Sequence, residues 1–239
     1  MPLETNRLPF VIGLDGLHRI GKGTQASMLQ AAINNGGGKS IVLRGDGTRD
    51  GLGLSDGDPC SEEWQLRNRQ LKSSEGNTIE GWNTSSYLLM QELNEIKTSN
   101  TEYDALIIDR TALSRVAFLL HRGVAPEGTR LTVDEMYPDN INAGNKSLNL
   151  AETLPDIIFD LQSATPTDLL ARLDDEDPKY AFRARNIRDG FNAATIAKVH
   201  LPKEIEQRVV TLDAARDIES MHASIRACLA KTAINNFLS

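Results

Sequence analysis

The clearest chemical pattern in the chain is a loop between two glycines that ends in a lysine. It follows the apolar run 9–14 and reads Gly16-Leu17-His18-Arg19-Ile20-Gly21-Lys22-Gly23-Thr24-Gln25. Because Gly16 and Gly21 have no Cβ atom, the backbone can turn its N–H groups inward around a phosphate. Lys22 can then reach the outer phosphates of a nucleotide, and a helix that begins here presents its positive end to them. We interpret this loop as an ATP-binding site; the alternative is a strand-to-helix turn that binds no ligand.

Two further side chains of the loop are candidates for phosphoryl-transfer chemistry. Arg19 can offset the charge that develops on the transferring group, although many loop arginines are simply exposed to solvent. The spacing departs from G-x-x-x-x-G-K-[ST], because Gly23 follows the lysine and the hydroxyl comes one place later, at Thr24. Thr24, directly or through a water, is therefore the candidate contact for Mg²⁺; its alternative role is a local hydrogen bond at the helix start.

An acid and an arginine close the apolar run 103–109, where a ligand of a parallel sheet is expected. Asp109 is a candidate for a carboxylate near Mg²⁺ or the phosphates, and Arg110 can hold a phosphate with two hydrogen bonds. The alternative is a helix-capping aspartate beside a surface arginine. Arg44, after the run 40–43, faces the same edge and suits the phosphate of an acceptor, unless it belongs to a solvated turn.

More arginines follow the acidic stretch 174–177. Arg183 and Arg185 lie in or beside a segment, about 174–188, that can act as a lid, exclude water and complete a phosphotransfer site. The acids themselves favour a solvated face over a metal site, because their spacing implies no ligand geometry.

Composition narrows the class of protein. The 239 residues carry a net charge of −7 without a run of Lys and Arg, which argues against polymeric nucleic acid as a partner. Cys60 and Cys228 lack metal-ligand spacing, and the first residues have no apolar segment typical of export, so we expect a cytoplasmic protein. No run approaches the roughly 18 apolar residues that cross a membrane.

Apolar runs alternate with helical patterns along the chain. Strands are expected at 9–15, 40–43, 103–109, 157–161 and 208–212. Helices are expected at 24–34, 62–72, 84–97, 112–121, 166–173, 184–199 and 218–230. This alternation predicts an α/β fold in which about five parallel strands carry helices on both faces, with residues 1–239 as one domain.

Taken in order, these segments resemble the thymidylate kinase family, P-loop nucleoside monophosphate kinases that phosphorylate dTMP with ATP. The loop 16–25 is similar to the family's G-x-D-R-x-G-K-S-T-Q, although its Gly-Thr-Gln ending looks more like adenylate kinase. The block 109–118 is similar to D-R-Y-x-x-S-x-x-A-[YF]. The segments 154–161 and 209–225 agree in outline. The resemblance implies a P-loop NTPase-type sheet, ATP, Mg²⁺ and a nucleoside monophosphate as acceptor.

Roles for single residues come from this resemblance. It implies catalytic roles for Lys22, Arg19, Asp109 and Arg183. It implies metal contacts for Thr24 and Asp109. It implies an acceptor site made of Asp15, Arg44, Tyr87, Gln91, Arg110 and Arg185. Tyr87 falls where an aromatic side chain stacks on the acceptor base.

The chain departs from the family pattern at three positions around the acceptor. His18 stands where the family has an acid for the sugar hydroxyl, and Asp15 is a possible substitute. Thr111 replaces a tyrosine that helps to exclude ribose, and Gln91 stands near an arginine that recognises thymine. We therefore expect dTMP or a related deoxypyrimidine monophosphate as acceptor. Two alternatives stay open: a P-loop kinase for another small acceptor, and a catalytically degenerate nucleotide-binding protein. The family also implies a homodimer, for which the apolar face of 112–121 is a candidate; the equal alternative is that this face belongs to the core.

Overall fold

The computed structural model describes residues 9–17, 19–44, 49–50, 96, 103–111, 114, 155–163, 165–173, 184, 187 and 201–238, with only the backbone at 44 and 49–50. The strands are β1 (Phe10–Gly16), β2 (Ser40–Arg44), β3 (Arg49–Asp50), β4 (Ala105–Asp109), β5 (Ile157–Gln162) and β6 (Val209–Asp213). The helices are α1 (Lys22–Asn35), α6 (Pro166–Leu170), α8 (Lys203–Glu206) and α9 (Ile218–Leu229), followed by the short 3₁₀ helix η2 (Asn235–Phe237).

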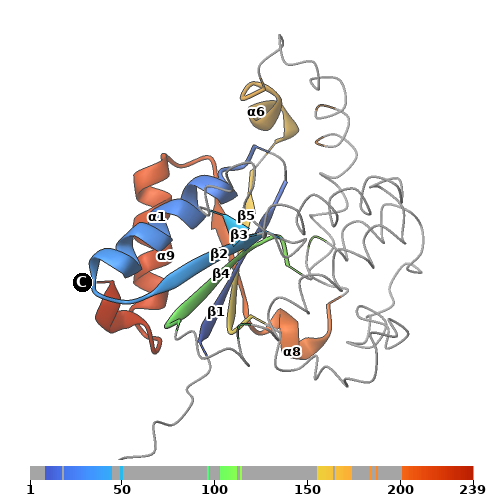
Figure 1. Cartoon of the computed structure of the whole chain (residues 1–239). Coiled ribbons are helices and arrows are strands. Elements are labelled where there is room, and N and C mark those ends of the chain that lie inside the picture. Colours follow the sequence, from blue (N-terminus) through green and yellow to red (C-terminus); the bar gives the residue numbers. More distant parts are fainter. Residues whose placement is uncertain are drawn as a thin grey trace, which may run out of the picture.

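The strands form one sheet in the order β3-β2-β4-β1-β5-β6 (Figure 1). The strands β2, β4, β1, β5 and β6 run parallel, and β3 pairs antiparallel with β2 at the edge. The expected five-stranded parallel sheet is therefore confirmed. Its order places β4 between β1 and β2, so that a strand about 90 residues further along the chain separates the first two strands.

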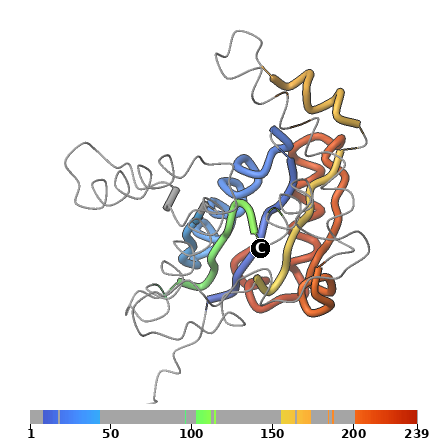
Figure 2. Tube along the Cα trace, turned by 90° about the vertical axis from the view of Figure 1, so that its right-hand side faces the viewer, coloured from blue at the N-terminus to red at the C-terminus, as the bar shows by residue number. Residues whose placement is uncertain are grey.

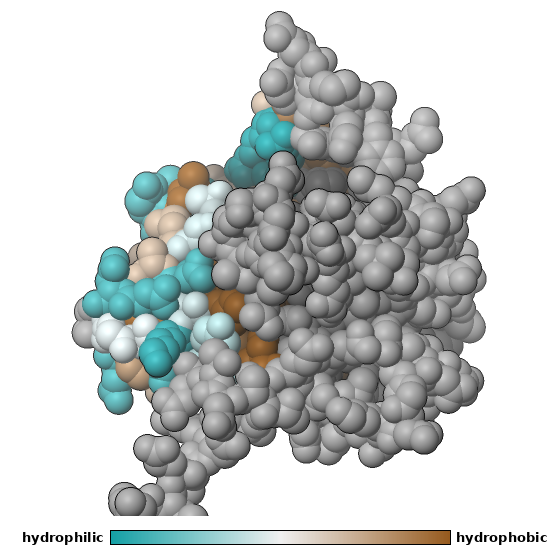
Figure 3. Space-filling model, viewed as in Figure 1, coloured by the Kyte–Doolittle hydropathy of each residue, from teal (hydrophilic) through white to brown (hydrophobic). Residues whose placement is uncertain are grey.

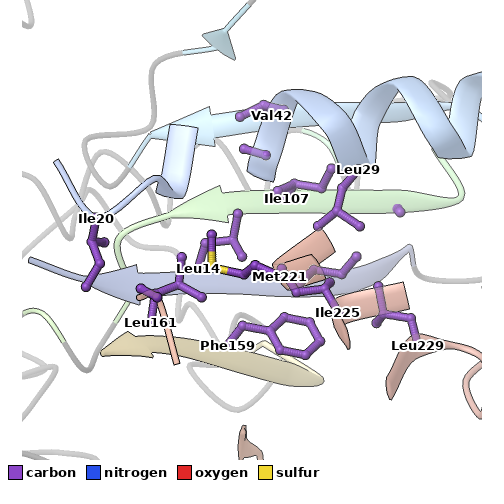
Figure 4. Packing of buried hydrophobic residues seen from close by; sticks show 14 of the residues in the cluster. Leu14, Ile20, Leu29, Val42, Ile107, Phe159, Leu161, Met221, Ile225 and Leu229 are labelled. Carbon is purple, nitrogen blue, oxygen red and sulfur yellow. The ribbon is translucent and has the colours of Figure 1, made fainter. Parts of the chain in front are cut away.

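The central strands are buried because they carry continuous apolar runs. Residues 105–108 and 11–14 are buried on both faces of the sheet, as expected for strands covered on both sides. On one face, α1 and α9 pack side by side over the sheet, and their apolar side chains meet those of β1, β4 and β5 (Figures 1 and 4). On the other face, Ile96 packs against a second cluster that includes Val11, Leu106 and Ile108. Ile96 is helical, which agrees with the expected helix 84–97.

The outer surface of α1 is polar where it meets solvent. Its exposed residues include Thr24, Ser27 and Asn34, and the described surface on this side is largely hydrophilic (Figure 3). At its far end, α1 stops at Gly36, whose close neighbour is the backbone of Phe237 in η2. The C-terminal segment therefore lies against the end of α1 that is remote from the phosphate loop.

Element boundaries differ from the expectations in a few places. Helix α1 begins at Lys22 rather than Thr24, because Gly21 already serves as its N-cap. The strand β3 and the helix α8 were not expected, since two and four residues leave no periodic signal. The expected helices 62–72, 112–121 and 184–199 lie outside the described residues, apart from the helical residues Ser114, Ala184 and Ile187.

The strands bring their carboxyl ends to one edge of the sheet, from which the loop to α1 departs. Figure 2 shows β4, β1 and β5 from the side, running next to one another. In register, Leu14 of β1 lies beside Asp109 of β4, and Asp109 lies beside Arg44 of β2. Asp109 and Arg44, which end β4 and β2, therefore share one level of the sheet with Leu14, two residues before β1 ends.

Candidate phosphate-binding site

The backbone of the loop between β1 and α1 has the conformation that a glycine-bracketed loop predicts. Gly16 has φ +135° and Gly21 has φ +105°, both in the range that residues with a side chain rarely adopt. A Cβ atom at Gly16 would also come within 2.5 Å of the Leu161 carbonyl oxygen in β5. The first glycine is therefore required both by its backbone angle and by the approach of a neighbouring strand.

Two residues inside the loop have opposite surroundings. Ile20 is buried in the main core cluster, at the same end of that cluster as Leu161 (Figure 4). Arg19 beside it is exposed and has φ +61°, an angle that is uncommon for a residue with a side chain. Burial of Ile20 anchors the loop to the sheet, while the adjacent guanidinium stays at the surface where a polyphosphate would lie.

The first turn of α1 supplies N–H groups that point out of the helix end. The N-cap is Gly21, which has no side chain to accept from them, and the first turn contains no acidic residue. The partial positive charge of a helix N-terminus attracts anions. Gly23 and Thr24 in this turn are exposed. A phosphate group can therefore approach the end of α1 directly.

Lys22 is folded back into the loop that it ends. Its side chain is only 6% exposed, and Nζ donates to the carbonyl oxygens of Gly16 at 3.0 Å and Leu17 at 2.8 Å. Burial, followed by the nearby Arg110 guanidinium, lowers the pKa of Lys22 to about 7, although Asp109 and Asp15 oppose this shift. Lys22, which the sequence assigned to the outer phosphates of a nucleotide, thus lies inside the loop. Its amine must leave the two carbonyl oxygens before it can reach those phosphates.

The Asp109–Arg110 turn lies at the same edge of the sheet as the loop. Arg110 donates its backbone N–H to the Leu14 carbonyl oxygen at 2.9 Å, so the turn is fastened to the strand that leads into the loop. Oδ1 of Asp109 is buried. Both residues act electrostatically on Lys22, with opposite signs. The structure therefore brings together Lys22, Asp109 and Arg110, which the sequence placed in one site from separate motifs.

Asp15 is fully buried, and both of its carboxylate oxygens accept hydrogen bonds. Oδ1 accepts from the backbone N–H of Ser114 at 3.1 Å, and Oδ2 from that of Thr111 at 3.0 Å. The hydroxyl groups of Ser114 and Thr111 also donate to this carboxylate. The hydrogen-bond partners of Asp15 that the structure describes are Thr111 and Ser114. A contact between Asp15 and the sugar of an acceptor stays a prediction.

Gln25, assigned to the ATP site by the sequence, joins α1 to α9. Its fully buried side chain donates through Nε2 to the Ile218 carbonyl oxygen at 3.0 Å, and Oε1 lies 3.1 Å from Nδ1 of His222. Burial and the nearby Arg226 lower the pKa of His222, which favours its neutral form. Gln25 therefore holds the start of α9 against the loop helix.

The residues that suit a divalent cation are few. No group of three or more His, Cys, Asp and Glu side chains forms a metal centre among the described residues. Among the described residues near the loop, Asp109 offers a carboxylate and Thr24 an exposed hydroxyl, while the Asp15 carboxylate already accepts from Thr111 and Ser114. This set fits a Mg²⁺ ion held mainly by nucleotide phosphates and water. Gly23 has no side chain that could bind a cation. The space beside it is open, because a Cβ atom there would meet nothing within 4 Å.

Several predicted site residues are not placed by the structure. His18, Tyr87, Gln91, Arg183 and Arg185 lie outside the described residues, and of Arg44 only the backbone is described. The lid segment 174–188 is described only at Ala184 and Ile187, both of which are buried. The roles of these residues, and the homodimer surface on 112–121, remain predictions.

Sequence reasoning missed the partners that hold the site in place. Thr111 was noted as a departure from the family pattern and Ser114 only as part of the block 109–118, and His222 was not considered. Gly13 was read as part of an apolar run, yet a Cβ atom there would lie 2.5 Å from Cγ2 of Thr111. The sequence contained one signal for these partners: Asp15 is an acid at the end of an apolar strand, and a buried acid needs hydrogen-bond donors around it.

The sheet order and the loop define the class of fold: a P-loop kinase-like α/β fold with five parallel strands in the order β2-β4-β1-β5-β6. No family model matches the sequence, and no curated protein matches it either. Among solved structures, the fold is similar to thymidylate kinase from Candida albicans, with a TM-score of 0.55. That alignment covers 96% of this chain and 93% of that one at 15% sequence identity. Such a likeness establishes the fold. Within the part of the chain that the structure describes, no helix is long and apolar enough to span a membrane.

Proposed function

We propose that the chain is an ATP- and Mg²⁺-dependent nucleoside monophosphate kinase whose acceptor is dTMP or a related deoxypyrimidine monophosphate. The observation that carries this proposal is the meeting, at one edge of the sheet, of two elements whose residues suit phosphate binding. The loop 16–22 follows β1, and the turn at Asp109 and Arg110 follows β4, the neighbouring strand. A kinase that joins two phosphorylated substrates needs two such elements side by side.

The donor half of the site rests on the loop. Backbone N–H groups of the loop and of the first turn of α1 would hold the β- and γ-phosphates of ATP. Lys22 would leave the carbonyls of Gly16 and Leu17 and donate to these phosphates. Arg19, exposed beside them, would offset the charge on the transferring group.

The acceptor half rests on arginines. Arg44 ends β2 beside Asp109 of the neighbouring strand β4, and Arg110 directly follows Asp109, which suits the phosphate of a nucleoside monophosphate. An oxygen of that phosphate would attack the γ-phosphorus in line; a new P–O bond forms, the bond to the β-phosphate oxygen breaks, and ADP leaves. The attacking oxygen is already anionic, so no general base is required. Arg183 in the lid would complete the site.

Few of the described residues would contact the proposed Mg²⁺ ion. Bound Mg²⁺ would neutralise charge on the β- and γ-phosphates during transfer. Asp109 and Thr24 are the residues that would hold it, directly or through water. The structural likeness to a thymidylate kinase supports this general chemistry. Because broad substrate specificity is described for that enzyme from Candida albicans, the acceptor base needs a panel rather than a single candidate.

The test is release of ADP from ATP and Mg²⁺, measured by a coupled assay against a panel of ribo- and deoxynucleoside monophosphates. Lys22→Ala should abolish acceptor-dependent turnover, because it removes the cation of the loop. Lys39→Ala is the matched control, since Lys39 is an exposed lysine at the opposite end of β2. Absence of acceptor-dependent turnover with every monophosphate would refute the proposal.

The same assay separates the two alternatives. Turnover only with an unphosphorylated acceptor, unchanged in its Michaelis constant by Arg110→Ala, would indicate a kinase for another small molecule. Tight ATP binding without any turnover would indicate a nucleotide-binding protein without catalysis.

A further inference from the structure

We propose that Asp15 is a positioning residue that holds the turn at 109–111, and through it the guanidinium of Arg110, in place beside the phosphate loop. This inference rests on the proposed function and deepens it, because it names what aims the acceptor-phosphate arginine. Sequence analysis instead assigned Asp15 to direct contact with the acceptor.

The first support is the set of hydrogen bonds to the Asp15 carboxylate. It accepts from the backbone N–H groups of Thr111 and Ser114 and from both of their hydroxyl groups. The side chain is 0% exposed, so these bonds form away from solvent. A buried carboxylate with charge-assisted bonds to the next turn of chain is a strong fastening point.

The second support is the conformation of the turn itself. Arg110 has φ +79°, in the left-handed region that a residue with a side chain adopts only when its surroundings hold it there. Three consecutive residues of β1 make the contacts that stabilise this conformation. Gly13 leaves room for the Thr111 methyl group, Leu14 accepts from the Arg110 N–H at 2.9 Å, and Asp15 binds Thr111.

The third support is the place of Asp15 in the chain. Asp15 directly precedes Gly16, where the loop that would bind ATP begins. One residue thus joins the donor loop to the acceptor turn, and a shift of the turn changes the position of Arg110 relative to Lys22. The two cations already influence each other electrostatically, which places them in one neighbourhood.

The test compares Asp15→Asn with Asp160→Asn in the full chain. The amide keeps the size of the carboxylate but offers one acceptor oxygen and no charge, so either the Ser114 hydroxyl, which donates to Oδ1, or the Thr111 hydroxyl, which donates to Oδ2, loses its acceptor. Asp160 is the matched control, because it is a buried acid in register with Asp15 on β5 and accepts from Gln162. Both variants are expected to lower the melting temperature.

The Michaelis constants distinguish positioning from a general loss of structure. Asp15→Asn should raise the constant for the acceptor by about tenfold or more, the factor expected for a bond to a charged group, and Asp160→Asn should not. The Michaelis constant for ATP should stay within about twofold of the wild-type value, because ATP occupies a separate site. In an Arg110→Ala background, Asp15→Asn should add no further effect on the acceptor, because the two residues act in series. Equal rises for ATP and acceptor, or additive effects in the double variant, would overturn the inference.

Hydrogen exchange separates this inference from the proposed function. Asp15→Asn should speed amide exchange at residues 110–114 relative to 157–162, whatever the substrate is. Faster exchange in a protein that phosphorylates no monophosphate would refute the kinase assignment and keep the anchoring role. Unchanged exchange at 110–114 would refute the anchoring role. If Asp15→Asn does not fold, Ser114→Ala removes one donor from the same carboxylate and should give a smaller effect of the same kind.

Discussion

Nucleotide binding should draw a proton from solvent onto Lys22. In the structure this amine is buried against the carbonyl oxygens of Gly16 and Leu17, and its pKa is lowered from 10.5 to about 7. A neutral amine has two hydrogens, one for each of these carbonyls, so the arrangement does not need the charge. Polyphosphate beside Lys22 favours the charged form, because an opposite charge at close range raises the pKa of a lysine.

The size of the effect follows from these two protonation states. If the pKa returns to about 10.5 in the complex, binding takes up about half a proton at pH 7 and about nine tenths at pH 8. The dissociation constant should then rise about fivefold between pH 7 and pH 8, and about tenfold between pH 8 and pH 9. Below about pH 6 the amine is already charged and the dependence disappears.

Titration calorimetry can measure this uptake. ADP is titrated at pH 8 with a chelator present, in buffers that differ in ionisation enthalpy, and the slope of the observed enthalpy gives the number of protons. At this pH the nucleotide's own phosphates are already ionised, since their last pKa is near about 6. Lys22→Arg is the control, because a guanidinium keeps its charge and should take up none. No uptake in the wild type at pH 8, or equal uptake in Lys22→Arg, would refute the reasoning.

The same residue should make stability depend on pH. Unfolding returns the pKa of Lys22 from about 7 to 10.5, so the penalty for burying its charge is fully present below pH 7 and amounts to about 5 kcal/mol. Between pH 7 and 10.5 the unfolded chain binds more protons, and the contribution of Lys22 to the free energy of unfolding rises with pH. Denaturant unfolding across this range should show a steeper rise for the wild type than for Lys22→Met.

Three further predictions concern the loop and its support. Gly16→Ala should lower the free energy of unfolding by about 2 kcal/mol or more, because of its φ of +135° and the Leu161 oxygen 2.5 Å from a Cβ atom; Gly23→Ala, with nothing within 4 Å, should cost less than half as much in the same urea titration. Gln25→Ala should lower this free energy by about 1–3 kcal/mol, since the Ile218 carbonyl loses its donor and a cavity forms; an unchanged melting curve would contradict this. Burial lowers the pKa of His222, so the free energy of unfolding of the protein should fall as pH drops below 6.5, where the unfolded chain takes up the proton first. His222→Gln should flatten this part of the plot of unfolding free energy against pH.

The elements around the site follow from local features of the sequence. Apolar runs predicted the five parallel strands, because a strand covered on both faces must be apolar throughout. Glycine spacing predicted a tightly turned backbone at Gly16 and Gly21, where φ is positive, and the lysine after them predicted the start of a helix within two residues. These features depend on neighbours in the chain, so a single sequence contains them.

The supports of the site depend on contacts between distant segments. Asp15 binds Thr111 across 96 residues, and Gln25 meets His222 across 197. Such pairs leave no periodic signal, since any of many polar residues can serve as the partner of a buried acid or amide. The position of Lys22 inside its own loop was missed for the same reason: burial is a property of the packed molecule.

The sequence by itself determined that a glycine-bracketed loop ending in a lysine follows the first strand and that an acid and an arginine come at the end of a later one. Only the tertiary structure decided that these strands are neighbours, since the order β2-β4-β1 comes from packing of the whole sheet. It also decided that Asp15 faces the Arg110 turn, because a hydrogen bond to a buried carboxylate forms only when both segments are brought out of water together.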